Sequence, residues 1–541
     1  MAHQKSEDRV VPEARGNPGQ SRAGRRGGGK AVPVKEVVQH QMQLFTTAEN
    51  PRGIREAGSH EDVDLSTSKR PSAPKVKSTP MKAGPASMEE VVERLEQAFE
   101  KVASNQGAPG PDRQTIELVR EHLPAVLTTL RKSLLDGSYR PGDIRRVWIP
   151  KASGGQRGLG IPNVVDRIVQ EAMRATLEPL FEPTFHPSSH GFRPNRSCQT
   201  AIAEARCHVD EGNQWVVDLD LENFFGQVHH QRLMSRLAQR VGDRRLLVLI
   251  SAMLKAKVVL PDGVKVSSDE GVPQGGPLSP LLSNVVLSEL DDELARRGHR
   301  FVRYADDCNI YVRSERAGLR VMASLSTFIS RRLRLNVNVS KSAVARPETR
   351  HFLGYRLVPR AGEAAEILLS ERSEKRLRER IVEKTPRARG CSLEETIERM
   401  NGYLNGWLGH FRVCTSGIER VLQYADAHIR RRMRAILLKQ WKTKQTIIRR
   451  LIRLGVKRQT AWRRVYERRK SIWALSHDPA VERGLRNAYF AKRGFVTLLE
   501  RFRPIWAAMN APKQLSFALG SEGPSAGRRK GSQPSVPKSR M

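Results

Sequence analysis

Aspartates occupy two short apolar segments in a pattern suited to binding divalent cations. In the segment WVVDLDLENFF, apolar residues alternate with Asp218 and Asp220. This alternation predicts a strand that carries both acids on one face, with Asp220 near its end. In the segment FVRYADDCNIYV, apolar residues flank an Asp pair on both sides, which predicts a hairpin whose turn contains Ala305, Asp306 and Asp307.

The three acids Asp220, Asp306 and Asp307 would repel one another if they converged without a counter-charge. Mg²⁺ is the natural cation for oxygen ligands that also bind phosphates. Two such ions can activate a 3′-hydroxyl and stabilise a leaving pyrophosphate in an in-line displacement, so these acids are candidate catalytic residues and metal ligands. An Asp pair in a tight hairpin is also ordinary turn chemistry, and Asp220 on a separate strand argues against that interpretation.

Helices and strands must bring these acids together. Between residues 87 and 360, helical stretches alternate with short apolar strands, which predicts an α+β domain. Ser87 and Glu90 fit a capping box at its start. From about residue 370 onward the strand patterns cease and helical patterns rich in Lys and Arg take over.

One of these helices carries an apolar stripe of Ile429, Met433 and Ile436. Outside this stripe stand four arginines, at positions 430, 431, 432 and 434. They are either a solvated helix face or contacts to RNA or DNA.

The composition indicates a polyanionic partner. Lys and Arg number 94 against 57 Asp and Glu, which gives a net charge of +37. Nucleic acid is the obvious partner for such a charge. No apolar run of about 18 residues is present, so we expect no membrane partner. The five cysteines form no C-x-x-C pair, and the N-terminus lacks an apolar signal region, which predicts reduced thiols and a cytoplasmic location.

The chain resembles the reverse transcriptases that group II introns encode. YADD at 304–307, Asp220 with Phe224 and Phe225 after it, and GVPQGGPLSPLLSN at 271–284 are similar to the palm of that family. Further similar motifs follow in the family's order: GAPGPD at 107–112, WIPK ending at Lys151, RGLGIP at 157–162, HGFRPNRS at 190–197, VSKSAV around Lys341, FLGY at 352–355, YLNGWLGHF at 403–411 and NAYFAKRGF at 487–495.

The resemblance implies an α+β, right-hand-like polymerase with fingers and palm, followed by an α-helical thumb and a basic helical region. The expected divisions are a disordered basic arm at 1–86, reverse transcriptase fingers and palm at 87–360, a helical thumb or maturase domain at 361–440, a basic DNA-binding region at 441–511 and a disordered tail at 512–541. No endonuclease domain is expected.

The resemblance also implies roles for single residues. Asp220, Asp306, Asp307 and the backbone carbonyl of Leu221 would hold two Mg²⁺ ions. Other residues would bind the nucleotide or its template, or donate a proton to pyrophosphate: Lys151, Arg157, Phe225, Gln274 and Lys341. Phe225 would exclude a ribose 2′-hydroxyl.

Each of these residues also has an ordinary structural interpretation. Lys151 and Arg157 could be surface cations, Phe225 a core residue and Gln274 part of a helix entry, while most lysines placed like Lys341 do nothing chemical. Two positions depart from the family pattern. Gly226 stands where the family has Asp, which would loosen the turn into the next helix, and Gly158 stands where it commonly has Pro.

The implied function is RNA-directed DNA synthesis on intron RNA from a DNA primer with dNTPs, together with binding of structured intron RNA to assist splicing. Two alternatives remain open: a domesticated reverse transcriptase used in defence or repair, and an RNA-binding splicing factor without polymerase activity. The oligomeric state is left open.

Overall fold

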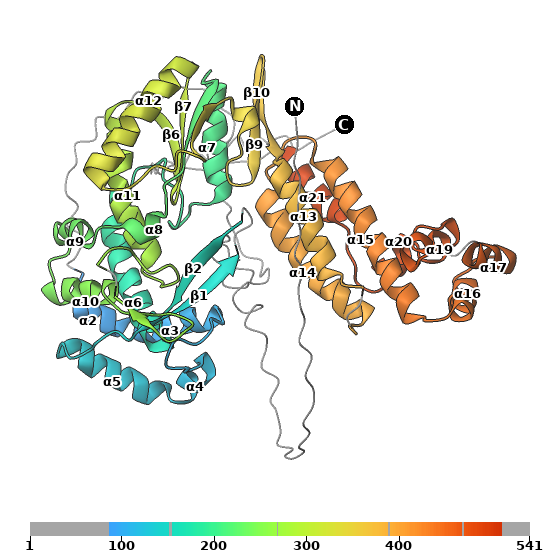
Figure 1. Cartoon of the computed structure of the whole chain (residues 1–541), viewed down its shortest axis with the longest axis horizontal. Coiled ribbons are helices and arrows are strands. Elements are labelled where there is room, and N and C mark those ends of the chain that lie inside the picture. The colour runs from blue at the N-terminus through green and yellow to red at the C-terminus, as the bar shows by residue number, and fades with distance from the viewer. Residues whose placement is uncertain (1–85, 151–153, 268, 388–389, 468–469, 511–541) are drawn as a thin grey trace, which may run out of the picture.

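The computed structural model describes residues 86–150, 154–267, 269–387, 390–467 and 470–510 (Figure 1). The predicted arm at 1–86, apart from Ala86, and the predicted tail at 512–541 lie outside these ranges, as does Lys151. Figure 1 shows a body of helices and sheets, coloured blue to yellow, beside a wholly helical body in orange and red. The predicted α+β fold with a helical C-terminal part is therefore confirmed.

The N-terminal helices surround one long buried helix. They are α2 (Met88–Glu93), α3 (Leu95–Ser104), α4 (Ile116–Glu121), α5 (Leu123–Leu135) and the long helix α6 (Val164–Phe181). The Ser87 side chain accepts a hydrogen bond from the backbone N of Glu90 at 3.3 Å, which confirms one half of the predicted capping box. The Glu90 carboxylate accepts from Arg94 at 2.6 Å instead of forming the other half. α3 packs along α6. α6 buries even polar side chains such as Gln170, against which Gly276 packs so closely that an added Cβ would lie 2.2 Å from Oε1 of Gln170.

A small sheet extends from these helices in the order β2-β1-β4-β5. Its strands are β1 (Ile144–Pro150), β2 (Gln156–Ile161), β4 (Val258–Val259) and β5 (Lys265–Val266). β1 and β2 form an antiparallel ribbon, and only the pair β1–β4 in this sheet is parallel. The ribbon presents Arg157 opposite Ile149.

The central sheet has the order β6-β7-β3-β8, with every neighbouring pair antiparallel. Its strands are β3 (Trp215–Leu219), β6 (Arg300–Tyr304), β7 (Asp307–Val312) and β8 (Ala343–Ala345). The predicted strand and hairpin are thus confirmed, with one difference. Asp307 pairs with Tyr304 as the first residue of β7, so the turn itself is Ala305 and Asp306.

The two faces of this sheet pack into two different hydrophobic cores. Val216, Val302 and Tyr311 pack with α7 (Cys198–Asp210) in the core that continues into the C-terminal helices. Val217 and Ile310 face the core shared with the N-terminal helices. Because side chains alternate along a strand, this one sheet joins both parts of the molecule.

The remaining elements of the first body connect or cover these sheets. They are η1 (Glu182–Thr184), α8 (Phe224–Gln227), α9 (His230–Ala238), α10 (Arg244–Leu254), α11 (Ser279–Arg296), α12 (Glu315–Phe328), η2 (Ile329–Leu333) and η3 (Pro347–Thr349). Residues 273–278 form the turn predicted before a helix, and α11 then begins at Ser279.

The C-terminal part begins with a hairpin and continues in helices. The elements are β9 (Tyr355–Arg360), β10 (Glu363–Leu369), α13 (Glu371–Lys384), α14 (Leu393–Phe411), α15 (Ile418–Gln440), α16 (Lys444–Arg453), α17 (Arg458–Tyr466), α18 (Ile472–Leu475), α19 (Pro479–Gly484), α20 (Asn487–Ala491) and α21 (Leu498–Asn510). In the described ranges no strand follows Leu369, as predicted. One apolar core runs from β9 to Phe502.

Two of the four arginines outside the apolar stripe of α15 differ from the prediction. Arg432 and Arg434 are 7% and 8% exposed, so neither belongs to a solvated face nor to a surface that could bind RNA. Arg432 donates to the side-chain and backbone oxygens of Thr385, and Arg434 donates to the backbone oxygen of Leu485 and to Glu482. Both guanidinium groups therefore join α15 to neighbouring segments.

None of the helices in the described ranges combines the length and the apolar character that a membrane span requires.

Candidate active site

Asp220 follows the last residue of β3 and is fixed through its backbone. Its N donates to Oγ of Ser342 at 3.0 Å, and its O accepts from the N of Asn338 at 2.8 Å. Leu221 next to it pairs with Val337 in a single antiparallel bridge. The side chain of Asp220 is 25% exposed and lies beside Lys341, whose Nζ is 3.2 Å from Oδ2.

The turn between β6 and β7 is held in a demanding backbone conformation. Ala305 has a φ of 58°, in the left-handed region that a residue with a side chain seldom adopts. Gly191 approaches so closely that an added Cβ would lie 2.2 Å from the N of Ala305. The HGFRP segment therefore needs glycine at this position to support the turn that carries Asp306 and Asp307.

Arg303 supports the same turn from inside. It forms an ion pair with Asp291 at 2.6 Å, with both side chains 0% exposed, and its Nη1 donates to the backbone oxygen of Ala305 at 2.8 Å. Nη1 also donates to Asn284 of α11 at 3.1 Å, and Asn284 in turn donates to the Gly191 backbone oxygen at 2.9 Å. A buried charge is tolerated only when it is paired and hydrogen-bonded in this way. The sequence motifs did not predict these residues, although an arginine inside an apolar strand was a signal for them.

The three acids influence one another electrostatically. Burial raises the pKa of Asp306, and Asp220 raises it further, while the guanidinium of Arg157 opposes both effects. Asp307 reaches the molecular surface, but most of the space around its carboxylate is filled by protein. This burial raises the pKa of Asp307 to about 7, and repulsion from Asp306 is the next contribution. The predicted acids are thus within electrostatic reach, and their charges are incompletely compensated.

The donor set fits a hard cation such as Mg²⁺. Carboxylate oxygens and backbone carbonyls are the ligands that Mg²⁺ accepts, and among the described residues no hydrogen bond occupies the carbonyl oxygen of Leu221. Within the described ranges, however, no three His, Cys, Asp or Glu side chains are close enough together to hold a metal ion. The Asp220 carboxylate forms an ion pair with the ammonium of Lys341. The assignment of metal ligands stays a prediction.

Asp218 has a different role from Asp220. Its carboxylate accepts two hydrogen bonds from Arg350, one from Nε at 2.8 Å and a shorter one from Nη2. Nη2 of Arg350 also donates to the backbone oxygen of Lys341 at 2.9 Å. Arg350 therefore connects the strand acid to the segment that presents Lys341 to Asp220. No local pattern in the sequence marks Arg350, because it lies 132 residues from Asp218.

The residues predicted to bind nucleotide come from neighbouring elements. Arg157 is exposed on β2 and acts electrostatically on Asp306. The backbone oxygen of Gln274 accepts from the N of Gly160 at 2.7 Å, and a Cβ on Gly275 would lie 2.2 Å from the oxygen of Gly160. The glycine-containing turn is therefore pressed against β2, the strand of Arg157.

Phe225 is half-buried at the start of α8, whereas Phe224 is 2% exposed in the core. Their rings meet edge to face with centroids 5.2 Å apart. The backbone oxygen of Phe225 accepts from the N of Val272 at 2.6 Å, which joins α8 to the PQGG segment. Phe225 is thus placed less deeply than a core residue and beside the predicted template segment.

The two departures from the family pattern have local structural reasons. At Gly226 an added Cβ would meet the Asn223 side chain at 2.3 Å, so this asparagine fills the space and α8 still forms. At Gly158 an added Cβ would lie 2.6 Å from Nη1 of Arg146, which donates to the Gly158 oxygen at 3.1 Å. Glycine at 158 therefore leaves room for an arginine on the ribbon.

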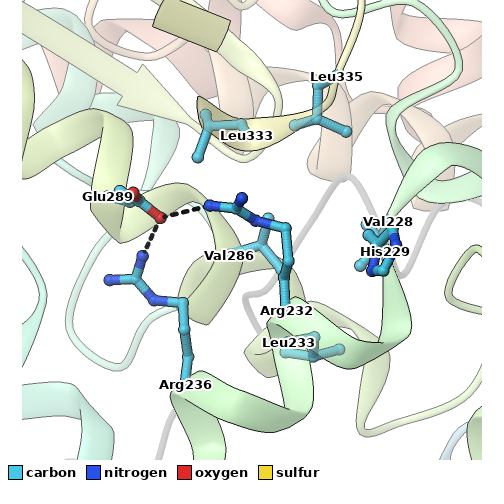
Figure 2. Close-up of a pocket in the computed structure, with 9 residues that line it drawn as sticks. All are labelled: Val228, His229, Arg232, Leu233, Arg236, Val286, Glu289, Leu333 and Leu335. Carbon is cyan, nitrogen blue, oxygen red and sulfur yellow. Dashed lines mark hydrogen bonds and ion pairs between the residues drawn. The ribbon is translucent and has the colours of Figure 1, made fainter. Parts of the chain in front are cut away.

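Figure 2 shows a separate small hollow between α9, α11 and η2. Glu289 there turns its carboxylate toward Arg232 and Arg236, with N–O distances of 3.6 and 2.5 Å. The hollow has a volume of about 20 Å³, which suits a single water molecule. Its lining includes none of the predicted site residues, so it is no part of the candidate site.

Two family models match this chain. The model described as reverse transcriptase (RNA-dependent DNA polymerase) matches residues 149–357, which include the central sheet and its acids. The model described as group II intron, maturase-specific domain matches residues 374–455.

Individual relatives agree with these matches. Protein YkfC of Escherichia coli strain K12 is 33% identical over 316 residues, which cover 51% of this chain and 83% of YkfC. The group II intron-encoded protein LtrA of Lactococcus lactis subsp. cremoris is 37% identical over 173 residues, which cover 32% of this chain and 28% of LtrA. The putative COX1/OXI3 intron 2 protein of Saccharomyces cerevisiae is 34% identical over 200 residues, 37% of this chain and 23% of that protein.

The chain thus spans most of one relative and about a quarter of the two intron-encoded ones. From the two family matches and these relatives, we conclude that the chain belongs to the group II intron-encoded reverse transcriptases, RNA-directed DNA polymerases that carry a maturase-specific domain.

Proposed function

We propose that this reverse transcriptase extends a DNA primer on intron RNA by two-metal phosphoryl transfer, with Asp220, Asp306 and Asp307 as its catalytic carboxylates. One observation carries the assignment of the site. The turn that carries Asp306 and Asp307 lies within electrostatic reach of Asp220. Burial, followed by repulsion from Asp306, Asp218 and Asp220, raises the pKa of Asp307 to about 7. A charge arrangement that is unfavourable without a cation is typical of a functional site.

Mg²⁺ ions bound by these carboxylates and the Leu221 carbonyl would supply charge neutralisation at the reacting phosphate. The other residues position the substrate. Arg157, and Lys151 outside the described residues, would orient the triphosphate of the incoming dNTP through charge-assisted hydrogen bonds. Gln274 and the tight turn at Gly275 would lie against the templating base pair.

Lys341 and Phe225 would act at opposite ends of the nucleotide. The ammonium of Lys341, close to Asp220, would donate a proton to the leaving pyrophosphate. The half-buried ring of Phe225 would leave no room for a ribose 2′-hydroxyl. These are the roles that the resemblance to the family implies for the two residues.

The proposed partners are structured intron RNA and the DNA primer at its insertion target. A net charge of +37 supports strong, salt-dependent binding of phosphate backbones. The maturase-specific match at 374–455 supports a part for the helical region in splicing. We therefore propose the expected division: fingers and palm at 87–360, thumb or maturase domain at 361–440 and basic DNA-binding region at 441–511. A splicing assay with cognate intron RNA would distinguish a reverse transcriptase that assists splicing from a domesticated reverse transcriptase used in defence or repair.

Primer extension tests the polymerase assignment. The full chain is supplied with an RNA template, an annealed DNA primer, dNTPs and Mg²⁺. We expect extension that stops when the metal is chelated, and loss of extension in Asp306→Ala and Asp307→Ala with RNA binding retained. Asp262→Ala, in the exposed turn between β4 and β5, is the matched control. Failure of the wild-type chain to extend any primer, while it still binds RNA, would favour a splicing factor without polymerase activity.

A further inference from the structure

Two aromatic rings form an exposed stack on α17. Trp462 and Tyr466 stand four residues apart, with ring centroids 5.2 Å apart and an angle of 13° between the planes. Their side chains are 43% and 44% exposed. Trp407 and Trp441, in contrast, are buried in the core of the same region. The stack therefore does not serve to fill the interior.

The segment around the stack is unusually basic. Between Lys442 and Arg464 the chain has nine Lys and Arg residues and no Asp or Glu. Of these nine, only Arg464 forms an ion pair with another described residue, Glu467 at 3.1 Å. Lys457, Arg458 and Arg463 are exposed beside the rings. The surface thus combines flat apolar rings with uncompensated positive charge.

The stack is also held in place. Lys444 of α16 places Nζ 4.9 Å from the centroid of the Tyr466 ring. α16 and α17 pack against each other through buried side chains that include Leu451, Ala461 and Val465. A rigid support reduces the entropy that a ligand must overcome on binding.

Helix stability alone does not account for this arrangement. Side-chain pairs at this spacing stabilise an isolated helix by only about 0.2–0.5 kcal/mol, and two large rings in water offset part of that gain. A protein partner would require apolar or acidic groups opposite a surface of exposed cations. Nucleic acid matches both features, because bases stack on aromatic rings and phosphates attract the cations.

We propose that Trp462 and Tyr466 form a stacking platform for an unpaired base of RNA, with neighbouring cations contacting its phosphates. This inference rests on the proposed binding of RNA by this chain. The two rings lie within the region 441–511 that is proposed above to bind DNA. RNA is favoured at this site because α16, whose Lys444 lies over the Tyr466 ring, belongs to the maturase-specific match that ends at residue 455. An unpaired base is required because bases inside an RNA duplex offer no free face for stacking.

Binding of labelled oligonucleotides by the full chain tests the platform. The probes are an RNA hairpin, the same hairpin with a single-stranded tail, and a single-stranded DNA of the tail sequence. Stacking of one base contributes about 1–3 kcal/mol. We therefore expect Trp462→Ala to weaken binding of the tailed RNA by about 5- to 150-fold and to leave the blunt hairpin within about twofold.

Conservative and control variants sharpen the test. Trp462→Phe and Tyr466→Phe each keep an aromatic ring, so these variants should retain most of the wild-type affinity for the tailed RNA. Trp506→Ala removes a tryptophan that is 44% exposed on α21, and binding should stay as in the wild type. In the wild type, the tailed RNA should also quench tryptophan fluorescence, and this signal should be smaller for Trp462→Ala.

Three outcomes would overturn the platform. They are equal binding of the tailed RNA by the wild type and Trp462→Ala, equal losses for tailed and blunt RNA, and a loss confined to the DNA probe. Failure of the wild type to bind any RNA would instead refute the proposed function on which the inference rests.

Discussion

Nζ of Lys341 lies 3.2 Å from Oδ2 of Asp220. The Lys341 ammonium therefore forms an ion pair with a carboxylate that a catalytic cation would bind. Lys341→Met removes this competitor and also the proposed proton donor. We expect the Mg²⁺ concentration for half-maximal extension to fall, while the maximal rate falls by about 10²- to 10⁴-fold, the range typical of a lost general acid. Single-nucleotide extension across a Mg²⁺ titration measures both quantities.

Lys341→Arg is the matched control for charge. It keeps the competing cation but holds its proton too tightly for proton transfer, so the Mg²⁺ requirement should stay near that of the wild type while the rate still falls. If both variants keep the wild-type rate, Lys341 has no part in the chemistry and serves only as a counter-charge for Asp220.

Phe225 provides a test of sugar selection. In Phe225→Ala, the space for a 2′-hydroxyl should lower the preference for dNTPs over rNTPs by about 10- to 200-fold, the range typical of one group in a pocket. Competing dNTP and rNTP incorporation into one primer measures the ratio.

Phe224→Leu is the control, since Phe224 is 2% exposed and belongs to the core. This substitution shortens a core side chain, so it should cost less stability than the about 3–5 kcal/mol of a Phe→Ala change, and sugar selection should stay unchanged. Equal selectivity in wild type and Phe225→Ala would mean that Phe225 is simply a packing residue.

The sequence predicts those parts of the fold that depend on local patterns. Alternation of apolar and acidic residues correctly placed β3, and the Asp pair between apolar runs correctly placed the β6–β7 hairpin. The same patterns cannot show partners that come from far along the chain. The burial of Arg432 was missed because the oxygens that satisfy it belong to Thr385, 47 residues away.

The site was predictable to a similar extent. Its acids stand out because their residue type conflicts with an apolar surrounding, and Arg303 could have been found by the same reasoning. Arg350 could not, because its partners Asp218 and Lys341 meet it only through the pairing of β3 with β8 and the loop after β8. Long-range hydrogen bonds of this kind become visible only in the folded chain.

The contact of Arg350 with Asp218 predicts an effect on stability as well as on rate. Both side chains are about three-quarters buried, at 26% and 21% exposure. Arg350→Ala leaves the carboxylate without its donor, which should lower the free energy of unfolding by about 1–3 kcal/mol. It also frees the Lys341 backbone, so extension should slow. Denaturant unfolding and primer extension measure the two effects.

A double-mutant cycle isolates the pair. With Asp218→Asn in the background, Arg350→Ala should cost less stability than in the wild type, because the charge that needs the donor is already absent. Additive losses would show that Arg350 acts through Lys341 alone and that its contact with Asp218 contributes nothing measurable.

The raised pKa of Asp307 predicts how metal-free protein responds to pH. The pKa is about 7 in the folded chain against an ordinary value of 3.8. Between these two values the unfolded chain loses this proton while the folded chain keeps it, so rising pH favours unfolding. Below the window both states are protonated, and above it both are ionised. In chelator, wild type should therefore lose stability relative to Asp307→Asn from about pH 4 to pH 7 and no further above that.

A divalent cation should reverse this penalty, because it binds the ionised carboxylates and removes their mutual repulsion. Binding of Mg²⁺ should consequently release a proton near pH 6, where Asp307 is still largely protonated, and release almost none near pH 9. Calorimetry of Mg²⁺ binding in buffers of different ionisation enthalpy measures this proton, and Asp307→Asn should abolish the difference between the two pH values. Equal proton release at pH 6 in wild type and variant would show that Asp307 is not the group that titrates when the metal binds.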